Sequence, residues 1–237
     1  MTLTLFDHLF VSILAAWMPI QGSLRYRRLI REVTAGTRHA RLRAYRRSLA
    51  WEWSLALTLV VGWIVAGRPL AELGLGLALD WQMLTGVGLT TAACTFLIRQ
   101  MSLVTDDQDA SQKLSHTMRH LRPLIPSNRR EMRVFVALSV TAGICEELLY
   151  RGFLLWYLGQ ITTTWMAVIA SSFIFGAGHA YQGGRGIATT GLFGLVAAGL
   201  YLLTGSLWAP MVLHAVLDIT SGNILRQVLH PRDRTDA

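Results

Sequence analysis

Apolar runs long enough to form membrane-spanning helices recur along the whole of this 237-residue sequence. A helix crosses the hydrocarbon core of a bilayer with about 20 apolar residues, and it satisfies its own backbone polar groups there. The chain is 52% apolar and only 15% charged, which favours a membrane protein over a soluble enzyme. The predicted spans are residues 9–20, 51–66, 81–97, 134–150, 165–180, 187–203 and 211–229. We therefore predict an all-α, polytopic membrane helical bundle of about seven transmembrane helices.

The first of these runs is the shortest. A helix over residues 9–20 reaches only about 18 Å. It therefore crosses the bilayer only if residues 3–6 extend it and Asp7 lies at the interface. If this run lies flat in the interface instead, six spans remain.

Positive charge is concentrated between the first two runs. The formal net charge is +8, and nine arginines fall between residues 25 and 47. The positive-inside rule predicts that this arginine-rich loop is cytoplasmic. Counting basic residues across the other connections then puts the N-terminus outside and the C-terminus in the cytoplasm. Because arginine is used far more than lysine, which indicates a GC-rich genome, we predict a multi-pass protein of a bacterial inner membrane.

The arginine-rich loop has a helical pattern of apolar residues among its charges. This pattern predicts two helices on the membrane surface, separated at Gly36 and in contact with anionic lipid headgroups. A basic balance also suits nucleic acid, but the sequence contains no recognisable nucleic-acid-binding module. We therefore predict lipid, and no nucleic acid, as the partner of this loop.

Three formal charges, on Glu146, Glu147 and Arg151, lie inside the fourth predicted span. Each ionised side chain costs at least ~2.5–3.5 kcal/mol at the centre of a helix in lipid, so such residues usually face a protein interior or a water-filled cavity. Glu147 and Arg151 are four residues apart, on one helix face, where they can neutralise each other. Glu146 lies about 100° round the helix. No partner within the motif accounts for it, which leaves its carboxylate free for chemistry.

Two later spans also carry polar groups at membrane depth. His179 lies in the fifth predicted span, and His214 and Asp218 are four residues apart in the last. Residues so costly to bury are expected to meet, which places the active site inside the C-terminal half. At a spacing of four, Asp218 can accept a hydrogen bond from the imidazole of His214 and select its tautomer.

Together and in this order, the three motifs resemble those of the CPBP intramembrane proteases, which include the type II CAAX prenyl endopeptidases and the bacterial Abi proteins. The resemblance covers about residues 126–218, and the ordered set is more specific than any single motif. The matching features are the acidic pair Glu146 and Glu147 with Arg151 four residues beyond the second, Phe175 four residues before His179, and His214 four residues before Asp218.

The resemblance implies a role for each of these residues. Glu146 would activate water as a general base, His179 would assist it, His214 and Asp218 would form the oxyanion side, and Glu147, Arg151 and Phe175 would support the site. We therefore predict an intramembrane glutamic endopeptidase of the CAAX-protease type. Its substrate would be a membrane-associated protein or peptide, cleaved for example at a C-terminal tail or a leader peptide, and it would need no cofactor.

One position departs from the prenyl endopeptidases, which carry asparagine where this chain has Asp218. An amide can donate a hydrogen bond to an oxyanion, whereas an ionised carboxylate cannot. Asp218 therefore either is protonated and donates, or orients His214, and we expect the second role.

The resemblance divides the chain into two parts. Residues 1–125 contain the N-terminal transmembrane helices, the arginine-rich loop and a polar linker. Residues 126–237 form the catalytic core.

Three alternatives use the same residues. Glu146, His179, His214 and Asp218 are a plausible zinc-binding set for a metal-dependent protease, although no His-Glu-x-x-His spacing is present. Intramembrane Glu, His and Asp also serve as proton relays in transporters. A polar network can, finally, hold helices together in a protein without catalytic activity.

Overall fold

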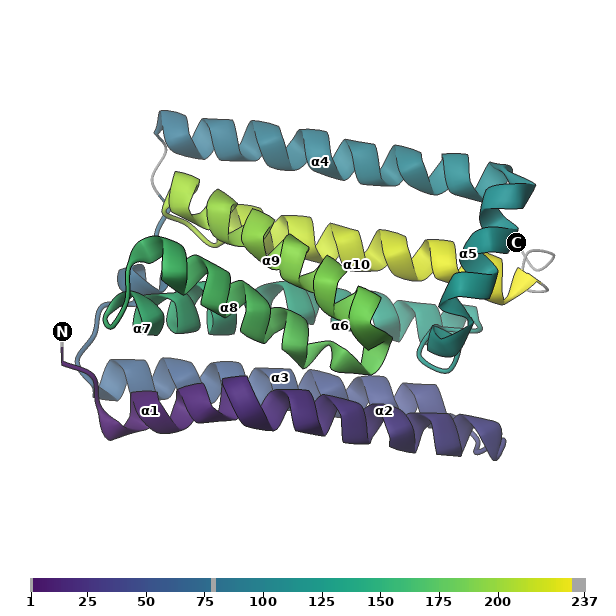
Figure 1. Ribbon diagram of the computed structural model, residues 1–237, viewed down its shortest axis with the longest axis horizontal. Coiled ribbons are helices and arrows are strands. Elements are labelled where there is room, and N and C mark those ends of the chain that lie inside the picture. The colour runs from purple at the N-terminus through teal and green to yellow at the C-terminus, as the bar shows by residue number, and fades with distance from the viewer. Residues whose placement is uncertain (1, 78–79, 232–237) are drawn as a thin grey trace.

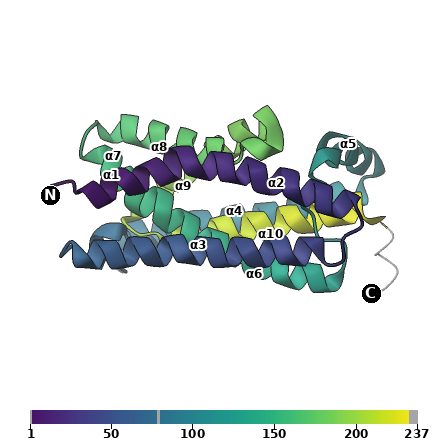
Figure 2. The same ribbon diagram turned by 90° about the horizontal axis from the view of Figure 1, so that it is seen from below.

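The computed structural model describes residues 2–77 and 80–231, and these residues form helices and no strands. The long helices lie roughly side by side along the long axis of the molecule (Figures 1 and 2). This arrangement confirms the predicted all-α membrane helical bundle.

The first helical rod runs along most of the bundle (Figure 2). It consists of α1 (Leu5–Ser12), a π-helical turn (Ile13–Trp17) and α2 (Met18–Thr34), which follow one another without a break. Thr4 caps its start, because the hydroxyl of Thr4 accepts a hydrogen bond from the amide of Asp7. The rod therefore extends well beyond the predicted span at both ends.

The arginine-rich loop differs from its prediction. The chain turns at Gly36, whose φ of 66° lies in the left-handed region that glycine tolerates, and α3 (Ala40–Val65) then packs against α2. The predicted break at Gly36 is confirmed. The prediction of two separate surface helices is wrong, because each arginine-bearing segment is one end of a long helix that contains an apolar run. Helix propagation costs little once begun, and in α3 no glycine or proline separates the arginines from the apolar run.

Asp7 is buried within the protein. Its two carboxylate oxygens accept hydrogen bonds from Arg68, with Nη1–Oδ1 and Nη2–Oδ2 distances of 2.7 Å. The guanidinium carbon of Arg68 also lies 5.0 and 4.6 Å from the ring centroids of Trp63 and Trp156. Because a bidentate pair satisfies both charges away from water, it fixes the start of the first rod to the segment that follows α3.

Helix α4 (Trp81–Asp106) packs against α10 (Trp208–Leu229). Asp80 caps α4 by accepting a hydrogen bond from the amide of Met83. The helix continues past its predicted end at residue 97, and most of the polar stretch that follows it is α5 (Gln108–Met118). Two short 3-10 helices complete the N-terminal half, Leu70–Leu73 and Arg119–Leu121.

The C-terminal half begins at Asn128, which caps the next helix by accepting a hydrogen bond from the amide of Glu131. Its elements are α6 (Arg129–Glu147), a π-helical segment (Leu148–Leu154), α7 (Leu155–Gly159), α8 (Thr164–Gly178), a 3-10 turn (Ala180–Gln182), α9 (Gly183–Thr204) and α10. The connection between the predicted spans 165–180 and 187–203 is shorter than those bounds imply. Gly183, with a φ of 83°, turns the chain and is already the first residue of α9.

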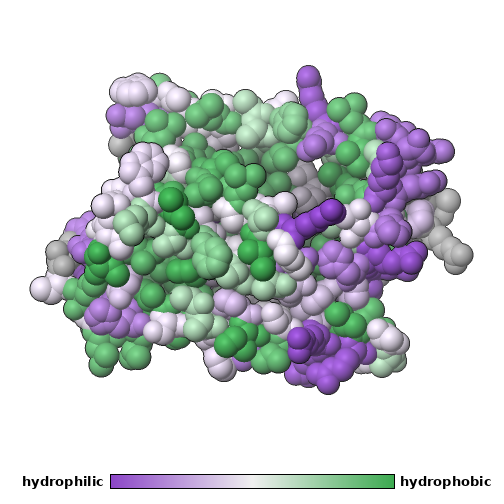
Figure 3. Space-filling view, in the orientation of Figure 1, coloured by the Kyte–Doolittle hydropathy of each residue, from purple (hydrophilic) through white to green (hydrophobic). Residues whose placement is uncertain are grey.

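Several of these helices suit a lipid environment. Four helical stretches are long and apolar enough to cross a membrane, Leu5–Thr34, Ala40–Val65, Trp81–Asp106 and Ala180–Thr204, and the shorter α8 is also apolar. Large apolar side chains such as Val65, Trp165 and Phe173 are exposed on their surfaces. Hydrophilic residues gather at the end of the molecule that holds α5 and the turn between α2 and α3, on the right of Figure 3. The protein is therefore a multi-pass membrane protein, and the number of seven spans stays a prediction.

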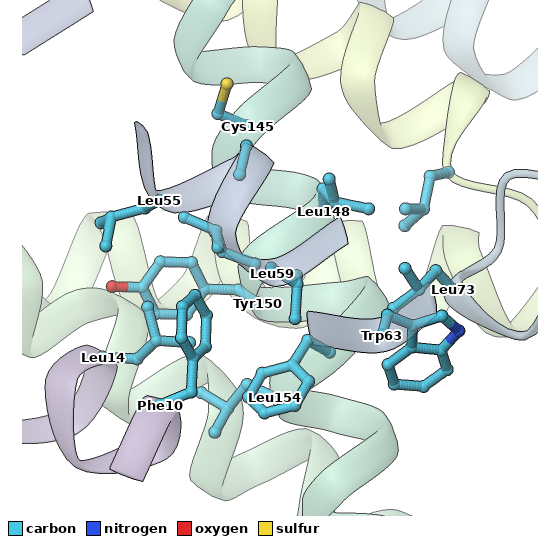
Figure 4. Close-up of a cluster of buried hydrophobic side chains, with 14 of the residues drawn as sticks. Phe10, Leu14, Leu55, Leu59, Trp63, Leu73, Cys145, Leu148, Tyr150 and Leu154 are labelled. Carbon is cyan, nitrogen blue, oxygen red and sulfur yellow. The ribbon is translucent and has the colours of Figure 1, made fainter. Parts of the chain in front are cut away.

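The main apolar core joins the N-terminal helices to the helix that carries the acidic pair (Figure 4). Its central side chains are Phe10, Leu14, Leu55, Leu59, Trp63, Leu73, Cys145, Leu148, Tyr150 and Leu154. Cys145 and Leu148 immediately flank Glu146 and Glu147 in the sequence. The core therefore contains residues from both predicted parts of the chain, and it holds the acidic pair in place from the N-terminal side.

Candidate active site

The acidic pair lies where α6 ends and the π-helical segment begins. Glu147 and Arg151 are 0% and 1% exposed, and Arg151 Nη1 donates a hydrogen bond of 2.9 Å to Glu147 Oε1. The predicted ion pair between them is confirmed. The wide π-helical turns after Glu147 were not predicted, and turns of this kind occur frequently at functional sites.

His214 of α10 is held by Glu147. The distance between His214 Nδ1 and Glu147 Oε1 is 2.7 Å, so this carboxylate oxygen accepts hydrogen bonds from both Arg151 and His214. The prediction that Asp218 makes this hydrogen bond is not met, because Asp218 Oδ2 lies 3.9 Å from His214 Nε2. A separation of 3.9 Å exceeds the hydrogen-bond range. The buried Glu147 is thus the residue that selects the tautomer of His214.

The second nitrogen of His214 faces Glu146. Its Nε2 atom lies 3.9 Å from Glu146 Oε2, and Glu146 Oε2 is buried without a hydrogen-bond partner in the protein. At this separation one water molecule can bridge the two groups. Glu146, His214 and Asp218, which were predicted to meet, therefore do lie together.

His179 lies directly after α8 and is fixed by its own helix. Its Nδ1 atom is 3.0 Å from the carbonyl oxygen of Phe175, four residues earlier. Carbonyl oxygens at the end of a helix lack intrahelical partners, and a carbonyl can only accept, so Nδ1 carries the proton. In a neutral His179 the Nε2 atom then has a free lone pair, as a base requires.

The ring of Phe175 packs between the charged groups of the site. It is 1% exposed, and its centroid lies 4.3 Å from the guanidinium carbon of Arg151. The same ring is 5.0 Å from the ring of His179 and 5.9 Å from that of His214, between centroids. Phe175 therefore positions residues from three helices at once, which gives a physical reason for its predicted supporting role.

Two glycines bring the site helices close together. A Cβ atom on Gly143 of α6 would lie 2.7 Å from the carbonyl oxygen of Met211 in α10. A Cβ atom on Gly176 of α8 would lie 2.6 Å from the carbonyl oxygen of Ile187 in α9. Small residues of this kind allow helix backbones to approach one another in membranes. Here Gly143 brings α6 against α10, and Gly176 brings α8 against α9.

A cavity of about 700 Å³ opens beside these groups. Residues of α2, α3 and α6 line it, together with His179 and Tyr181 near the end of α8. Glu146 and His179 both contribute to its wall. The cavity has the size of sites that enclose small ligands, and the candidate base and its assisting histidine both line it.

One acidic residue of the cavity was missed in the sequence. Glu52 of α3 lines the cavity, is 8% exposed, and has a buried Oε2 atom without a hydrogen-bond partner. The signal was available, because Glu52 is an acidic residue inside the second predicted span. Its neighbours Trp51 and Trp53 are typical of a membrane interface, where an acidic residue does not by itself indicate a functional site.

No group of three or more His, Cys, Asp or Glu side chains with the geometry of a metal site occurs among residues 2–77 and 80–231. The absence of a cofactor from the reaction stays a prediction.

Comparison with protein families agrees with the motifs. The family model for the Rce1-like type II CAAX prenyl endopeptidases matches residues 128–220. This segment belongs to the Rce1-like family. The predicted resemblance is thereby confirmed, and the Rce1-like segment contains every motif residue from Glu146 to Asp218. Searches of curated proteins and of solved structures found no match. The family indicates a peptidase that acts on protein or peptide substrates at the membrane.

Proposed function

We propose that this protein is an intramembrane endopeptidase in which Glu146 is the general base. The observation that carries the proposal is the placement of Glu146 Oε2, which is buried, has no hydrogen-bond partner and lies 3.9 Å from His214 Nε2. Glu146 also lines a cavity of peptide size together with His179. These are the groups that hydrolysis of a peptide bond needs around one reacting carbon.

In the first step, Glu146 takes a proton from a water molecule, and the oxygen of that water attacks the carbonyl carbon of the peptide. His179 accepts a hydrogen bond from the same water at its free Nε2 atom, because its Nδ1 proton is donated to the Phe175 carbonyl. A positioned base of this kind contributes about 10²–10⁴-fold to the rate. The product of this step is a tetrahedral carbon with an oxyanion.

His214 stabilises that oxyanion. With Nδ1–H donated to Glu147, the protonated imidazole presents its Nε2–H towards the cavity side of the site, where Glu146 lies. Such a preorganised donor acts strongly where water is excluded. Asp218 lies 3.9 Å from Nε2, and its negative charge orients and complements the imidazolium.

In the last step, the oxyanion collapses and the carbon–nitrogen bond breaks. Glu146 returns its proton to the leaving nitrogen, and the second proton of the water stays on the new carboxyl group. The products are therefore a carboxylic acid and an amine, which become a carboxylate and an ammonium group by proton transfer, and no covalent intermediate forms. Glu146 carries the one proton that moves from water to nitrogen, and no step needs a metal ion. Exhaustive chelation is accordingly expected to leave cleavage unchanged.

The reaction is tested with a peptide library and the protein in proteoliposomes. Glu146→Gln keeps the size of the side chain and removes the base, so we expect kcat to fall at least about 100-fold. Glu72→Gln changes an exposed glutamate outside the cavity and serves as the matched control. Near-normal cleavage by Glu146→Gln, with an unchanged thermal unfolding curve, would refute the assignment.

A further inference from the structure

Glu52 is a carboxylate of the active-site cavity that the proposed reaction leaves unused. It belongs to α3, outside the Rce1-like segment, and it lines the same cavity as Glu146 and His179. It is 8% exposed, and its Oε2 atom is buried without a hydrogen-bond partner in the protein. A buried acceptor without a donor is costly. The geometry therefore calls for a donor that enters the cavity from outside.

The charges around Glu52 favour a positively charged donor. Glu52 interacts electrostatically with two further carboxylates, Glu146 and Asp218, and with the guanidinium of Arg25. The guanidinium carbon of Arg25, however, lies 4.7 Å from the ring centroid of Trp51, and Arg25 leaves Glu52 Oε2 without a hydrogen bond. The Oε2 atoms of both Glu52 and Glu146 are therefore left without a hydrogen-bond donor in the protein.

Two other arginines of the cavity wall are paired elsewhere. Arg28 and Arg47 lie 2.8 and 3.9 Å from the same oxygen of Glu32. Both guanidinium groups are therefore held at Glu32, within the arginine-rich part of α2 and α3, and neither donates a hydrogen bond to Glu52 Oε2.

We infer that Glu52 binds a lysine or arginine side chain of the substrate, next to the bond that is cleaved. The inference rests on the proposed function, because it assumes that a peptide occupies the cavity beside Glu146. A cavity of about 700 Å³ encloses several groups of an extended peptide. A charge-assisted hydrogen bond from a basic side chain would satisfy Glu52 Oε2. An acidic side chain at the same place would be repelled by the carboxylates of Glu52 and Glu146.

The test uses the full-length protein in proteoliposomes and pairs of peptides that differ at one position between arginine and citrulline, its neutral isostere. The position is moved along both sides of the cleaved bond of a peptide that the protein cuts. At one position we expect arginine to raise kcat/KM at least about tenfold over citrulline, as a hydrogen bond to a charged group does. Glu52→Gln should bring this ratio to about one, whereas Glu72→Gln should keep it.

Glu52→Asp keeps the charge and should keep a preference for arginine, which separates the charge of Glu52 from its packing. Binding of the same peptides to the Glu146→Gln variant, followed by fluorescence anisotropy, gives a reading that does not depend on turnover. There the arginine peptide should bind about tenfold more tightly than the citrulline peptide.

Equal kcat/KM values at every position, or a preference for arginine that survives in Glu52→Gln, would overturn the inference while cleavage itself upheld the endopeptidase. Preferential binding of arginine peptides without any cleavage would support the binding site and refute the proposed function. If Glu52→Gln does not fold, equal kcat/KM values for arginine and citrulline on the unaltered protein still overturn the inference.

Discussion

At the scale of single residues, Glu147 connects the two sides of the site. One of its oxygens accepts hydrogen bonds from Arg151 and from His214, so a change at Glu147 affects an ion pair and a catalytic imidazole together. Its other oxygen, Oε2, is buried without a hydrogen-bond partner in the protein, as is Arg151 Nη2. The ion pair of Glu147 and Arg151 thus rests on a single hydrogen bond between opposite charges in the protein interior.

Replacing Glu147 with glutamine should destabilise the protein and abolish cleavage. The substitution leaves the buried guanidinium of Arg151 without a counter-ion, and removal of one partner of a buried pair costs about 3–5 kcal/mol. Adding Arg151→Met removes the orphaned cation at similar volume, so the double variant should regain stability but not cleavage. Thermal unfolding in detergent and peptide cleavage measure the two effects. Recovery of cleavage in the double variant would contradict the positioning role of Glu147.

Asp218→Asn distinguishes orientation from proton donation at the last motif. Asp218 is the most open of the three carboxylates near His214, with a side chain that is 40% exposed. An asparagine is as large, keeps a carbonyl oxygen beside His214, and can donate to an oxyanion without protonation. We therefore expect kcat to stay within about tenfold of the original, while Asp218→Leu, which removes both functions, loses more. A loss in Asp218→Asn as large as that of Glu146→Gln would show that the negative charge itself is required.

At the scale of helices, the approach of α8 to α9 sets where His179 lies. Gly176 is three residues before His179 and faces the backbone of α9, where its missing Cβ leaves room for the carbonyl oxygen of Ile187. The contact is between a glycine and backbone atoms, which cannot rotate away. The position of the histidine relative to Glu146 is therefore a property of the helix pair.

Gly176→Ala should lower both stability and activity. The added methyl group would lie 2.6 Å from the Ile187 carbonyl, and overpacking of this kind costs about 1–3 kcal/mol. Separation of α8 from α9 would also move His179. Gly199→Ala is the matched control, because a Cβ at that position of α9 meets nothing within 4 Å. The control should be neutral or slightly stabilising, since alanine favours helix over glycine by about 1 kcal/mol. Equal unfolding temperatures for the two variants would refute the packing argument.

Local relations between residues could be predicted from the sequence, and relations between distant segments could not. The pair of Glu147 with Arg151 follows from spacing along one helix. The hydrogen bond of Glu147 with His214 joins residues 67 positions apart. Glu52 reaches the site only because α3 packs against α6. The period of apolar residues along one helix does not predict these contacts, because the contacts depend on which helix faces pack together.

At the scale of the whole molecule, charge is distributed along the bundle axis. The start of α1 and the end of α10 lie at opposite ends of the bundle (Figure 1). The turn between α2 and α3 lies at the same end as α5 and the end of α10, and hydrophilic residues gather there (Figure 3). The cavity that Glu146 lines is also lined by Arg25 and Arg47, from the arginine-rich part of α2 and α3. We propose that this end faces the cytoplasm and contacts anionic lipid headgroups there.

Labelling of single cysteines tests this orientation in a bacterial inner membrane. Arg38 and Glu72 are both exposed, and they lie before and after α3, at its opposite ends. With Cys94 and Cys145 replaced by serine and alanine, we expect a membrane-impermeant maleimide added outside to label Glu72→Cys and to leave Arg38→Cys unlabelled until the membrane is opened. The reason is that nine arginines near one end of α3 favour retention in the cytoplasm. The reverse pattern of labelling would place the arginine-rich end outside the cell and would overturn the proposed orientation.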